Sequence, residues 1–474
     1  MRPDRAVPIV RAYDVQLDSR ERSRAKRLAR RLTRAHPELQ APRFHSRART
    51  GLDPRLPGLV LADCSGVTLS PPGTAIEHRM MFLADEGDIV VLAAPRAPAF
   101  EAYCRRLLGL ESVEVVSLRT ERGTSLGRRC LYDEELMDRL CERAREAGGL
   151  NLKPYMGTPS VWELASALGA RARVPIYVAA PPASLALRVN DKTWFSRCSQ
   201  ELLGPHSIPP SRPACGLAEL ARHVRTLSRA GSHLVVKLPS SAASAGNLVL
   251  DCRALHDLSP GDLFHFLEAT LSEGPLAGRF PVLVSIWESP VLASPSVQLW
   301  IPLEGEPVVE GVFSQDLSPR LARFLGARPA VLPGNTAFRL AAEASLLATC
   351  FQELGYFGRC SFDAILVGRD PSRCDLHWVE CNGRWGGTSL PMTLANRLLG
   401  DWRKRAMLVV HSMRPGPSSP WSVQSFLYPQ RNRSGIVWLV PHRMSFMALA
   451  PDIRQAEREA QAVMAGLGAQ SAAL

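Results

Sequence analysis

Apolar residues are arranged in two ways along the first half of the chain. Short apolar or β-branched runs bounded by Pro, Gly or Asp predict buried strands. Longer segments in which apolar residues recur every three or four positions predict helices. The expected strands are 57–63, 88–93, 174–179 and 233–238, and the expected helices are 97–109, 131–147, 161–170 and 217–230. This alternation indicates an α/β arrangement.

The second half contains more strand-like runs and fewer helices. The expected strands are 281–287, 296–302, 360–368, 375–382 and 434–440, and the expected helices are 338–354 and roughly 451–466. The segment RDPSR between the third and fourth of these strands has Asp-Pro turn chemistry, which is compatible with an antiparallel hairpin. Two Pro-rich stretches, 205–213 and 414–420, interrupt the pattern and predict connectors.

An arginine-rich segment at residues 19–35 has the spacing of a helix. One interpretation is a helix that binds nucleic acid. The other is a helix with a solvated basic face that turns Leu28 and Leu32 inward. We favour the second, because the segment has no aromatic residues on which bases could stack.

The composition is that of a globular protein. The 474 residues are 46% hydrophobic and 22% charged, a length that suggests roughly two to four domains. The net charge of +12 suggests an anionic partner. However, only five of the 57 basic residues are lysine, and this bias toward arginine is typical of a GC-rich genome. The few lysines therefore carry more information than the total charge.

The sequence gives no indication of secretion or of a membrane span. The first residues lack the apolar core of a signal peptide, and no stretch of about 18 apolar residues occurs. The eleven cysteines form no CxxC pair and no zinc-like cluster with histidine. We therefore expect a cytoplasmic protein with reduced thiols and no membrane partner.

The first candidate site is the segment HLVVKLPSSAASAGN at 233–247. Here a strand ends in Lys237 and is followed by a loop of small residues, where backbone N–H groups can approach an anion closely. A lysine supplies a compact positive charge for phosphate oxygens. The alternative is a lysine that extends to solvent before a flexible loop. The candidate phosphate-binding residues are Lys237, Ser240, Ser241, Ser244 and Gly246.

The second candidate site lies in the segment 361–388. If 360–368 and 375–382 form an antiparallel hairpin, Asp363 and Glu380 can face one site, and Asn382 points the same way as Glu380. Two carboxylates and an amide oxygen suit Mg²⁺. Arg384 adds a planar group for a phosphate or a carboxylate. The alternative is an ordinary hairpin whose polar residues satisfy one another.

Together the two sites resemble those of the ATP-grasp superfamily. The strand, Lys237 and the small-residue loop are similar to the phosphate-covering loop of that superfamily, and FDAIL…WVECNGRWGG is similar to its metal-binding core. Lys192, in VNDKTWFSRC, stands where such enzymes have an earlier phosphate-contacting lysine. The run VLVSIWE resembles the hinge strand that binds adenine, which adds Ile286, Trp287 and Glu288 to the nucleotide-binding candidates.

The flanking segments resemble a narrower group, the pheganomycin-type peptide ligases. The similar phrases are RMMFLADEGDIVVLAAP, LNLKPYMGTPSVWELASALG, SVQLWIP, EGVFSQDLS and GIVWLVPHRMSF. This resemblance implies an α/β pre-ATP-grasp domain at 1–188. It further implies an ATP-grasp domain at 189–405, with two α+β subdomains that grip ATP, and a small C-terminal domain at 406–474.

The resemblance also implies an activity. The chain is expected to be an ADP-forming carboxylate–amine ligase that joins peptide or small-molecule substrates through an acyl phosphate in peptide natural-product biosynthesis. Asp363, Glu380 and Asn382 would hold Mg²⁺ or Mn²⁺, and Lys192 and Lys237 would hold ATP phosphates. Arg384 and Lys237 would be the catalytic residues. Gly386, Gly387 and Thr388 would line the acceptor path.

Other functions stay open at this point. The nearest are an amino-acid dipeptide ligase and a glutathione-synthetase-like ligase, because substrate residues lie on variable loops. A non-catalytic basic protein that binds nucleotide or nucleic acid would use the segment 19–35. An ATP-grasp carboxylase acting on bicarbonate is a further alternative. We do not expect a nucleic-acid partner, and a homodimer is left open.

Overall fold

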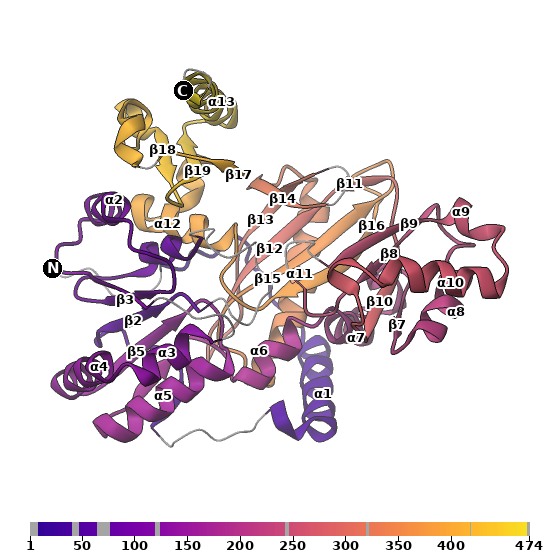
Figure 1. Ribbon diagram of the computed structural model, residues 1–474, viewed down its shortest axis with the longest axis horizontal. Coiled ribbons are helices and arrows are strands. Elements are labelled where there is room, and N and C mark those ends of the chain that lie inside the picture. The colour runs from indigo at the N-terminus through magenta and orange to yellow at the C-terminus, as the bar shows by residue number, and fades with distance from the viewer. Residues whose placement is uncertain are drawn as a thin grey trace.

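The computed structural model of the chain describes residues 8–39, 47–63, 76–118, 124–241, 246–318, 322–417 and 419–471. These residues form three β-sheets with helices packed on them (Figure 1). In Figure 1 the first sheet and the small four-stranded sheet lie on either side of the large sheet. No helix in the described ranges is long and apolar enough to cross a membrane.

The first sheet contains six parallel strands in the order β1-β6-β5-β2-β3-β4. All residues of β2 and β3 are buried, which explains their continuous apolar sequence. The strands are β1 (Ala48–Thr50), β2 (Gly58–Leu61), β3 (Ile89–Leu92), β4 (Glu114–Ser117), β5 (Leu150–Pro154) and β6 (Ile176–Val178). The accompanying helices are α2 (Pro98–Leu108), α3 (Leu126–Tyr132), α4 (Glu134–Ala147) and α5 (Pro159–Ala172).

The helix expected at 131–147 begins later than predicted. Asp133 ends α3 and starts α4, and its side chain accepts a hydrogen bond from the backbone N–H of Leu136 at 2.9 Å. Such an N-cap satisfies a backbone donor that has no partner within the helix. The helix then ends at Gly148, whose φ of 75° suits glycine.

The second sheet is four-stranded and antiparallel, in the order β7-β10-β8-β9. Its strands are β7 (Ser211–Ala214), β8 (His233–Lys237), β9 (Asn247–Asp251) and β10 (Val282–Ile286), and its helices are α8 (Leu217–Leu227), α9 (Cys252–His256) and α10 (Pro260–Leu271). The stretch 205–213, predicted to be a connector, contributes β7. Because β7 lies at the sheet edge, the missing N–H of Pro213 is tolerated there.

The large sheet has nine strands, in the order β11-β15-β12-β13-β14-β17-β19-β18 with β16 paired to β15. The first six of these strands in chain order are β11 (Val291–Ala293), β12 (Pro295–Ile301), β13 (Val308–Leu317), β14 (Phe324–Pro329), β15 (Gly358–Val367) and β16 (Asp375–Asn382). The last three are β17 (Ala406–Pro415), β18 (Gly435–Trp438) and β19 (Arg443–Ala450). The helices are α11 (Gly334–Glu353), α12 (Ser389–Leu399) and α13 (Ile453–Ser471). The C-terminal strands thus continue this sheet through the pairing of β14 with β17.

The arginine-rich segment forms α1 (Ser19–Ala35), which packs on α11 and α7 (Lys192–Leu203). Leu28 and Leu32 are buried, as the solvated-face interpretation predicts. Asp18 begins the helix with a capping box that includes Glu21. Several of its basic residues pair with the protein itself: Arg22 with Glu306, Lys26 with Glu353, and Arg31 with Glu201. These ion pairs make the segment less suited to bind nucleic acid.

Residues 13–39 therefore pack against the middle of the chain, in one apolar core with Phe351 and Phe362. The predicted boundaries at 188 and 405 count this segment with the first sheet. They stay a prediction about how the chain divides.

Candidate functional site

The expected hairpin is formed by β15 and β16, which pair antiparallel. Asp363 lies opposite Glu380, and Ser361 lies opposite Asn382. The amide of Asn382 donates a hydrogen bond to Asp363 Oδ2 at 2.9 Å. Ser296, on the neighbouring strand β12, donates to Asp363 Oδ1 at 2.5 Å. The structure thus places the three predicted metal ligands at one end of the hairpin.

The two carboxylates differ in their electrostatic surroundings. Burial, together with the nearby charge of Glu380, raises the pKa of Asp363 to about 7. Burial by itself would also raise the pKa of Glu380, but the positive charges of Lys192 and Arg384 outweigh it and lower that pKa. The charge of Glu380 is therefore compensated by neighbouring cations. A further positive charge would stabilise the charged form of Asp363.

Lys192 reaches this hairpin from the start of α7. Asp191 caps that helix through the backbone N–H groups of Thr193 and Trp194, which fixes the position of the lysine. The ammonium of Lys192 lies 3.0 Å from Glu380 Oε2, and its side chain is only 7% exposed. It also donates a hydrogen bond to the carbonyl oxygen of Ser241.

Two hydrogen bonds from Lys192 hold the loop after β8 against α7. The backbone N–H of Lys192 donates to the carbonyl oxygen of Pro239 at 3.0 Å, and its ammonium binds Ser241 as described above. The small-residue loop is thereby brought to the carboxylates, although 139 residues separate Ser241 from Glu380 in sequence. Ser244 lies outside the described residues.

Lys237 is the last residue of β8, where it lies opposite Leu283 of β10 and Asn247 of β9. Burial, together with the positive charge of Lys192, lowers its pKa to about 8, although Glu380 acts in the opposite direction. Gly246 closes the loop, with its carbonyl oxygen accepting from the N–H of Leu238 at 3.3 Å. A half-buried lysine beside a second lysine favours an anionic ligand between them.

A cleft joins most of these groups. Six residues predicted as site residues line it, namely Lys192, Ser240, Ser241, Glu380, Asn382 and Arg384. The remaining lining residues are Met156, Leu187, Asn190 and Cys381. The cleft therefore combines two cations, one carboxylate and two hydroxyl groups, whereas Asp363 and Lys237 do not line it.

Asn190 is a site residue that sequence reasoning missed. Its side-chain oxygen accepts hydrogen bonds from the N–H of Gly383, at 3.2 Å, and from the guanidinium of Arg384. Its amide group donates to the carbonyl oxygen of Ala186 at 2.7 Å, which ties it to α6 (Ala183–Val189). No sequence signal identifies this role, because 194 residues separate Asn190 from Arg384.

Two polar residues of β12 were also missed, although a signal existed. Gln298 donates to Ser296 Oγ at 2.8 Å, and Ser296 in turn binds Asp363. The alternation in SPSVQLW puts Ser296 and Gln298 on one face of the strand, and both are buried. A pair of buried polar residues at that spacing indicates a polar site beside them.

The predicted hinge residues lie at the end of β10. The N–H groups of Ile286 and Trp287 bind the carbonyl oxygens of Pro210 and His233, at 3.0 and 2.9 Å. Glu288 lies 3.3 Å from His377 Nδ1 on β16. None of the three lines the cleft around Lys192. Their part in binding adenine stays a prediction.

The donor set at the hairpin fits a hard divalent cation. Two carboxylates on directly paired positions and an amide on the same strand give oxygen ligands of the kind Mg²⁺ prefers. Within the described ranges, no group of three or more His, Cys, Asp and Glu side chains could hold a metal ion. Asn382 would thus have to complete the ligand set of Asp363 and Glu380.

Comparison with known proteins places this geometry in a fold. Residues 77–170 match the family model described as the Pre ATP-grasp domain. The ADP complex of N5-carboxyaminoimidazole ribonucleotide synthetase superposes with a TM-score of 0.55 at 12% identity, over 88% of this chain and 98% of that one. The chain has the ATP-grasp fold. No curated protein matches its sequence.

Two further ATP-grasp structures support the assignment. The N5-carboxyaminoimidazole ribonucleotide synthetase of Thermus thermophilus has a TM-score of 0.52 at 16% identity, over 87% of this chain and 98% of that one. The Campylobacter jejuni biotin carboxylase, in a complex named as β-γ-ATP, has a TM-score of 0.53 at 13% identity, over 84% and 88%. The ATP-grasp fold here is thus preceded by a pre-ATP-grasp domain, as expected from the sequence.

Proposed function

We propose that this chain is an ATP-dependent carboxylate–amine ligase that releases ADP and phosphate. The observation that carries the proposal is the cleft in which Lys192, the loop at Ser241 and Glu380 come together, with Asp363 opposite Glu380 on the paired strand. Cations beside oxygen ligands for a metal are what a phosphoryl-transfer site requires. The ATP-grasp fold of the chain supports this use of the cleft.

In the proposed reaction, the γ-phosphoryl group of ATP passes to a substrate carboxylate. The substrate amine then attacks the carbonyl carbon of the acyl phosphate, phosphate leaves, and an amide forms. Lys192 and Lys237 hold the phosphates with the loop amides. Arg384, oriented by Asn190, stabilises the negative charge on the acyl phosphate and on the oxyanion that follows it.

Asp363, Glu380 and Asn382 are the residues that would hold Mg²⁺, or Mn²⁺ in its place. The ion would neutralise charge on the phosphates. Asn382 and Ser296 both donate hydrogen bonds to the Asp363 carboxylate. Binding of the ion would require them to release that carboxylate or to share it. Positioning accounts for most of what these side chains contribute, because phosphoryl transfer needs little covalent chemistry from the protein.

We further place the chain with the pheganomycin-type peptide ligases, acting in peptide natural-product biosynthesis in the cytoplasm. Support comes from the sequence phrases quoted above and from the order of the three sheets, with the pre-ATP-grasp domain first. The ten described cysteines all carry free thiols, as a reducing compartment would leave them. Panels of peptides and of single amino acids distinguish peptide ligation from dipeptide ligation.

A second candidate is a ligase that uses bicarbonate as its carboxylate. It is favoured by the structural relatives, which include N5-carboxyaminoimidazole ribonucleotide synthetases, a biotin carboxylase and a 2-oxoglutarate carboxylase domain described in complex with bicarbonate. In such an enzyme, omission of bicarbonate would abolish ATP turnover. In a carboxylate–amine ligase that uses an organic acid, it would have no effect.

The decisive experiment measures phosphate release by the full chain with MgATP. Panels of amino acids, of peptides and of co-purified metabolites are supplied with and without bicarbonate, and products are identified by mass spectrometry. Arg384→Ala should reduce turnover far more than ATP affinity, whereas Arg458→Ala, an exposed position on α13, should change neither. Near-normal turnover by Arg384→Ala would overturn the assigned roles. If no panel stimulated turnover, the proposed ligase function would be overturned.

A further inference from the structure

A second, smaller cavity lies beside the acceptor side of the cleft. Its walls come from three parts of the chain. Arg79 belongs to the 3₁₀ segment η2 (Ile76–Leu83). Gly387 lies just before α12, and Leu390 and Pro391 lie in its first turn. The remaining residues are Val409, His411, Leu439 and Ser445, from the C-terminal strands and the turn between them. The pre-ATP-grasp domain, the catalytic sheet and the C-terminal strands therefore meet here.

Two chain segments join this cavity to the cleft. Met156 lines the cleft, while its neighbour Tyr155 contacts Arg79, whose guanidinium lies 5.7 Å from the centre of the tyrosine ring. Arg384 lines the cleft, and Gly387, three residues later, lines the second cavity. The N–H of Trp385 binds the carbonyl oxygen of Tyr155 at 3.1 Å, which holds the two segments together. Residues 384–387 thus run from one cavity to the other.

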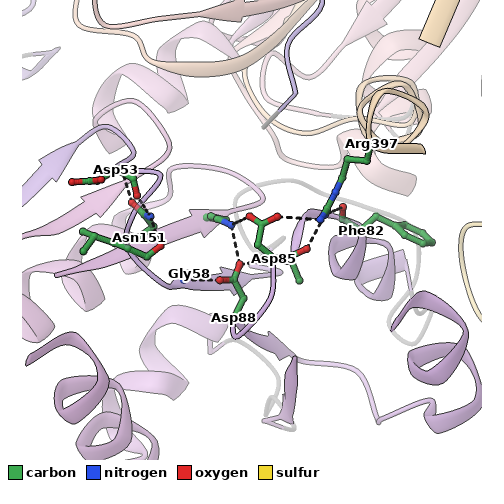
Figure 2. Close-up of polar contacts among 10 residues, drawn as sticks. Asp53, Gly58, Phe82, Asp85, Asp88, Asn151 and Arg397 are labelled. Carbon is green, nitrogen blue, oxygen red and sulfur yellow. Dashed lines mark hydrogen bonds and ion pairs between the residues drawn. The ribbon is translucent and has the colours of Figure 1, made fainter. Parts of the chain in front are cut away.

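The walls of the cavity are fixed in place by a buried polar network (Figure 2). Arg397 of α12 donates to the carbonyl oxygens of Phe82 and Ala84, both at 2.7 Å, and to Asp85 at 3.0 Å. Asp85 and the fully buried Asp88 both bind Lys153, at 2.6 and 2.8 Å. This network anchors η2, and with it Arg79, to the helix whose start forms the opposite wall. The network thus fixes the position of η2 relative to α12.

The cavity has a positive electrostatic character. None of its lining residues is acidic, and Arg79 has no ion pair among the described residues. Burial, reinforced by the positive charges of Arg79 and Arg443, lowers the pKa of His411 to about 4. His411 is therefore a neutral hydrogen-bonding group near pH 7, with Nδ1 3.3 Å from Ser445 Oγ. A guanidinium beside two neutral hydrogen-bonding groups suits an anion.

We propose that this cavity binds a carboxylate carried by the amine substrate, with Arg79 as its cation and His411 and Ser445 as hydrogen-bonding partners. The substrate class is thereby an α-amino acid or a short peptide, whose amine lies toward Arg384 and whose carboxylate lies toward Arg79. The apolar residues Leu390, Val409 and Leu439 face its carbon chain. This inference rests on the ligase function proposed above.

The test uses direct binding, so that it does not depend on knowing the carboxylate donor. The full chain with MgADP is titrated calorimetrically with L-amino acids and dipeptides, each with a free carboxylate and as the matching carboxamide. For at least one amine the acid should bind tenfold tighter or more than the carboxamide. Arg79→Gln should weaken the acid at least tenfold and leave the carboxamide unchanged.

Two variants control for folding and for charge. Arg458→Gln makes the same chemical change on the exposed surface of α13 and should leave all affinities unchanged. Arg79→Lys keeps the charge but loses the planar fork, and should retain part of the preference for the acid. The melting temperature of each variant is recorded. If Arg79→Gln is poorly folded, its loss of binding is set aside, and the affinities of Arg79→Lys test the subsite instead.

The outcomes separate this inference from the ligase function. Equal binding of acid and carboxamide, no binding by any member of the panel, or no effect of either substitution at Arg79 would overturn the carboxylate subsite. Each of these results is compatible with a working ligase that uses another amine. Conversely, acid-selective binding that depends on Arg79, in a chain without MgATP turnover, would support the subsite and refute the ligase.

Discussion

Removal of the Asn190 side chain should disable catalysis through Arg384. The side-chain oxygen of Asn190 accepts from the Arg384 guanidinium and from the N–H of Gly383, so both the arginine and the backbone before it depend on one atom. Asn190→Ala removes both bonds, together with the bond to Ala186. Arg384 lines the cleft next to Glu380 and Asn382. Without the bond to Asn190, its guanidinium would be free to turn toward Glu380.

The size of the effect follows from these bonds. A hydrogen bond to a charged group is worth about 1.5–3 kcal/mol. If that free energy is lost from the transition state alone, turnover should fall roughly 10- to 150-fold, at about 1.4 kcal/mol for each tenfold change. Affinity for MgATP should change by less than about threefold, because in the proposed mechanism Lys192 and Lys237, rather than Arg384, hold the phosphates.

The assay measures phosphate release under substrate saturation, alongside MgATP affinity by calorimetry. Asn190→Asp is the matched variant, since it keeps the accepting oxygen and adds an attractive charge, although it loses the donor to Ala186. It should retain more turnover than Asn190→Ala. If Asn190→Ala folds and turns over within twofold of the parent chain, or if its loss appears only in ATP affinity, the assigned role of Asn190 is wrong.

Three further predictions concern the phosphate site, the core and the acceptor path. The pKa of Lys237 is lowered to about 8, and bound phosphates favour its charged form. MgATP affinity, measured by titration calorimetry, should therefore be constant below pH 8 and fall above it. Lys237→Met should show no such fall. Arg359→Met leaves the buried carboxylate of Glu310 without its ion pair, so urea unfolding should show a loss of about 3–5 kcal/mol, while the double variant with Glu310→Gln should lose less. Gly387→Ala should slow ligation with little change in MgATP affinity, because its new Cβ would lie 2.7 Å from the ring of Phe324; an unchanged rate for a bulky amine would contradict this.

Several elements could be predicted from the sequence because their causes are local. The hairpin of β15 and β16 follows from alternation and a turn sequence, and it places Asp363 opposite Glu380 as expected, next to an irregularity in the pairing. The inward side of α1 follows from helical spacing, and its Leu28 is buried. Strands β13, β14 and β17 were not expected, because their sequences alternate weakly or contain Gly and Pro.

Other parts of the site depend on which elements the topology brings together. The contact of Lys192 with Glu380 and Ser241 requires α7, the loop after β8 and β16 to meet, and no local pattern encodes that meeting. The resemblance to a known superfamily supplied this grouping in advance, whereas Asn190 was missed because nothing in its own segment distinguishes it.

The sequence by itself determined the chemistry that the chain can offer: a lysine before a small-residue loop, two carboxylates and an amide on neighbouring strands, and an arginine beyond them. Periodicity and turn residues act over a few positions, so they were sufficient for these local arrangements. Only the tertiary structure decided which groups share a cleft, and that Arg79 and His411 face one cavity from distant segments. Such contacts depend on the packing of whole sheets and helices, which is a property of the complete chain.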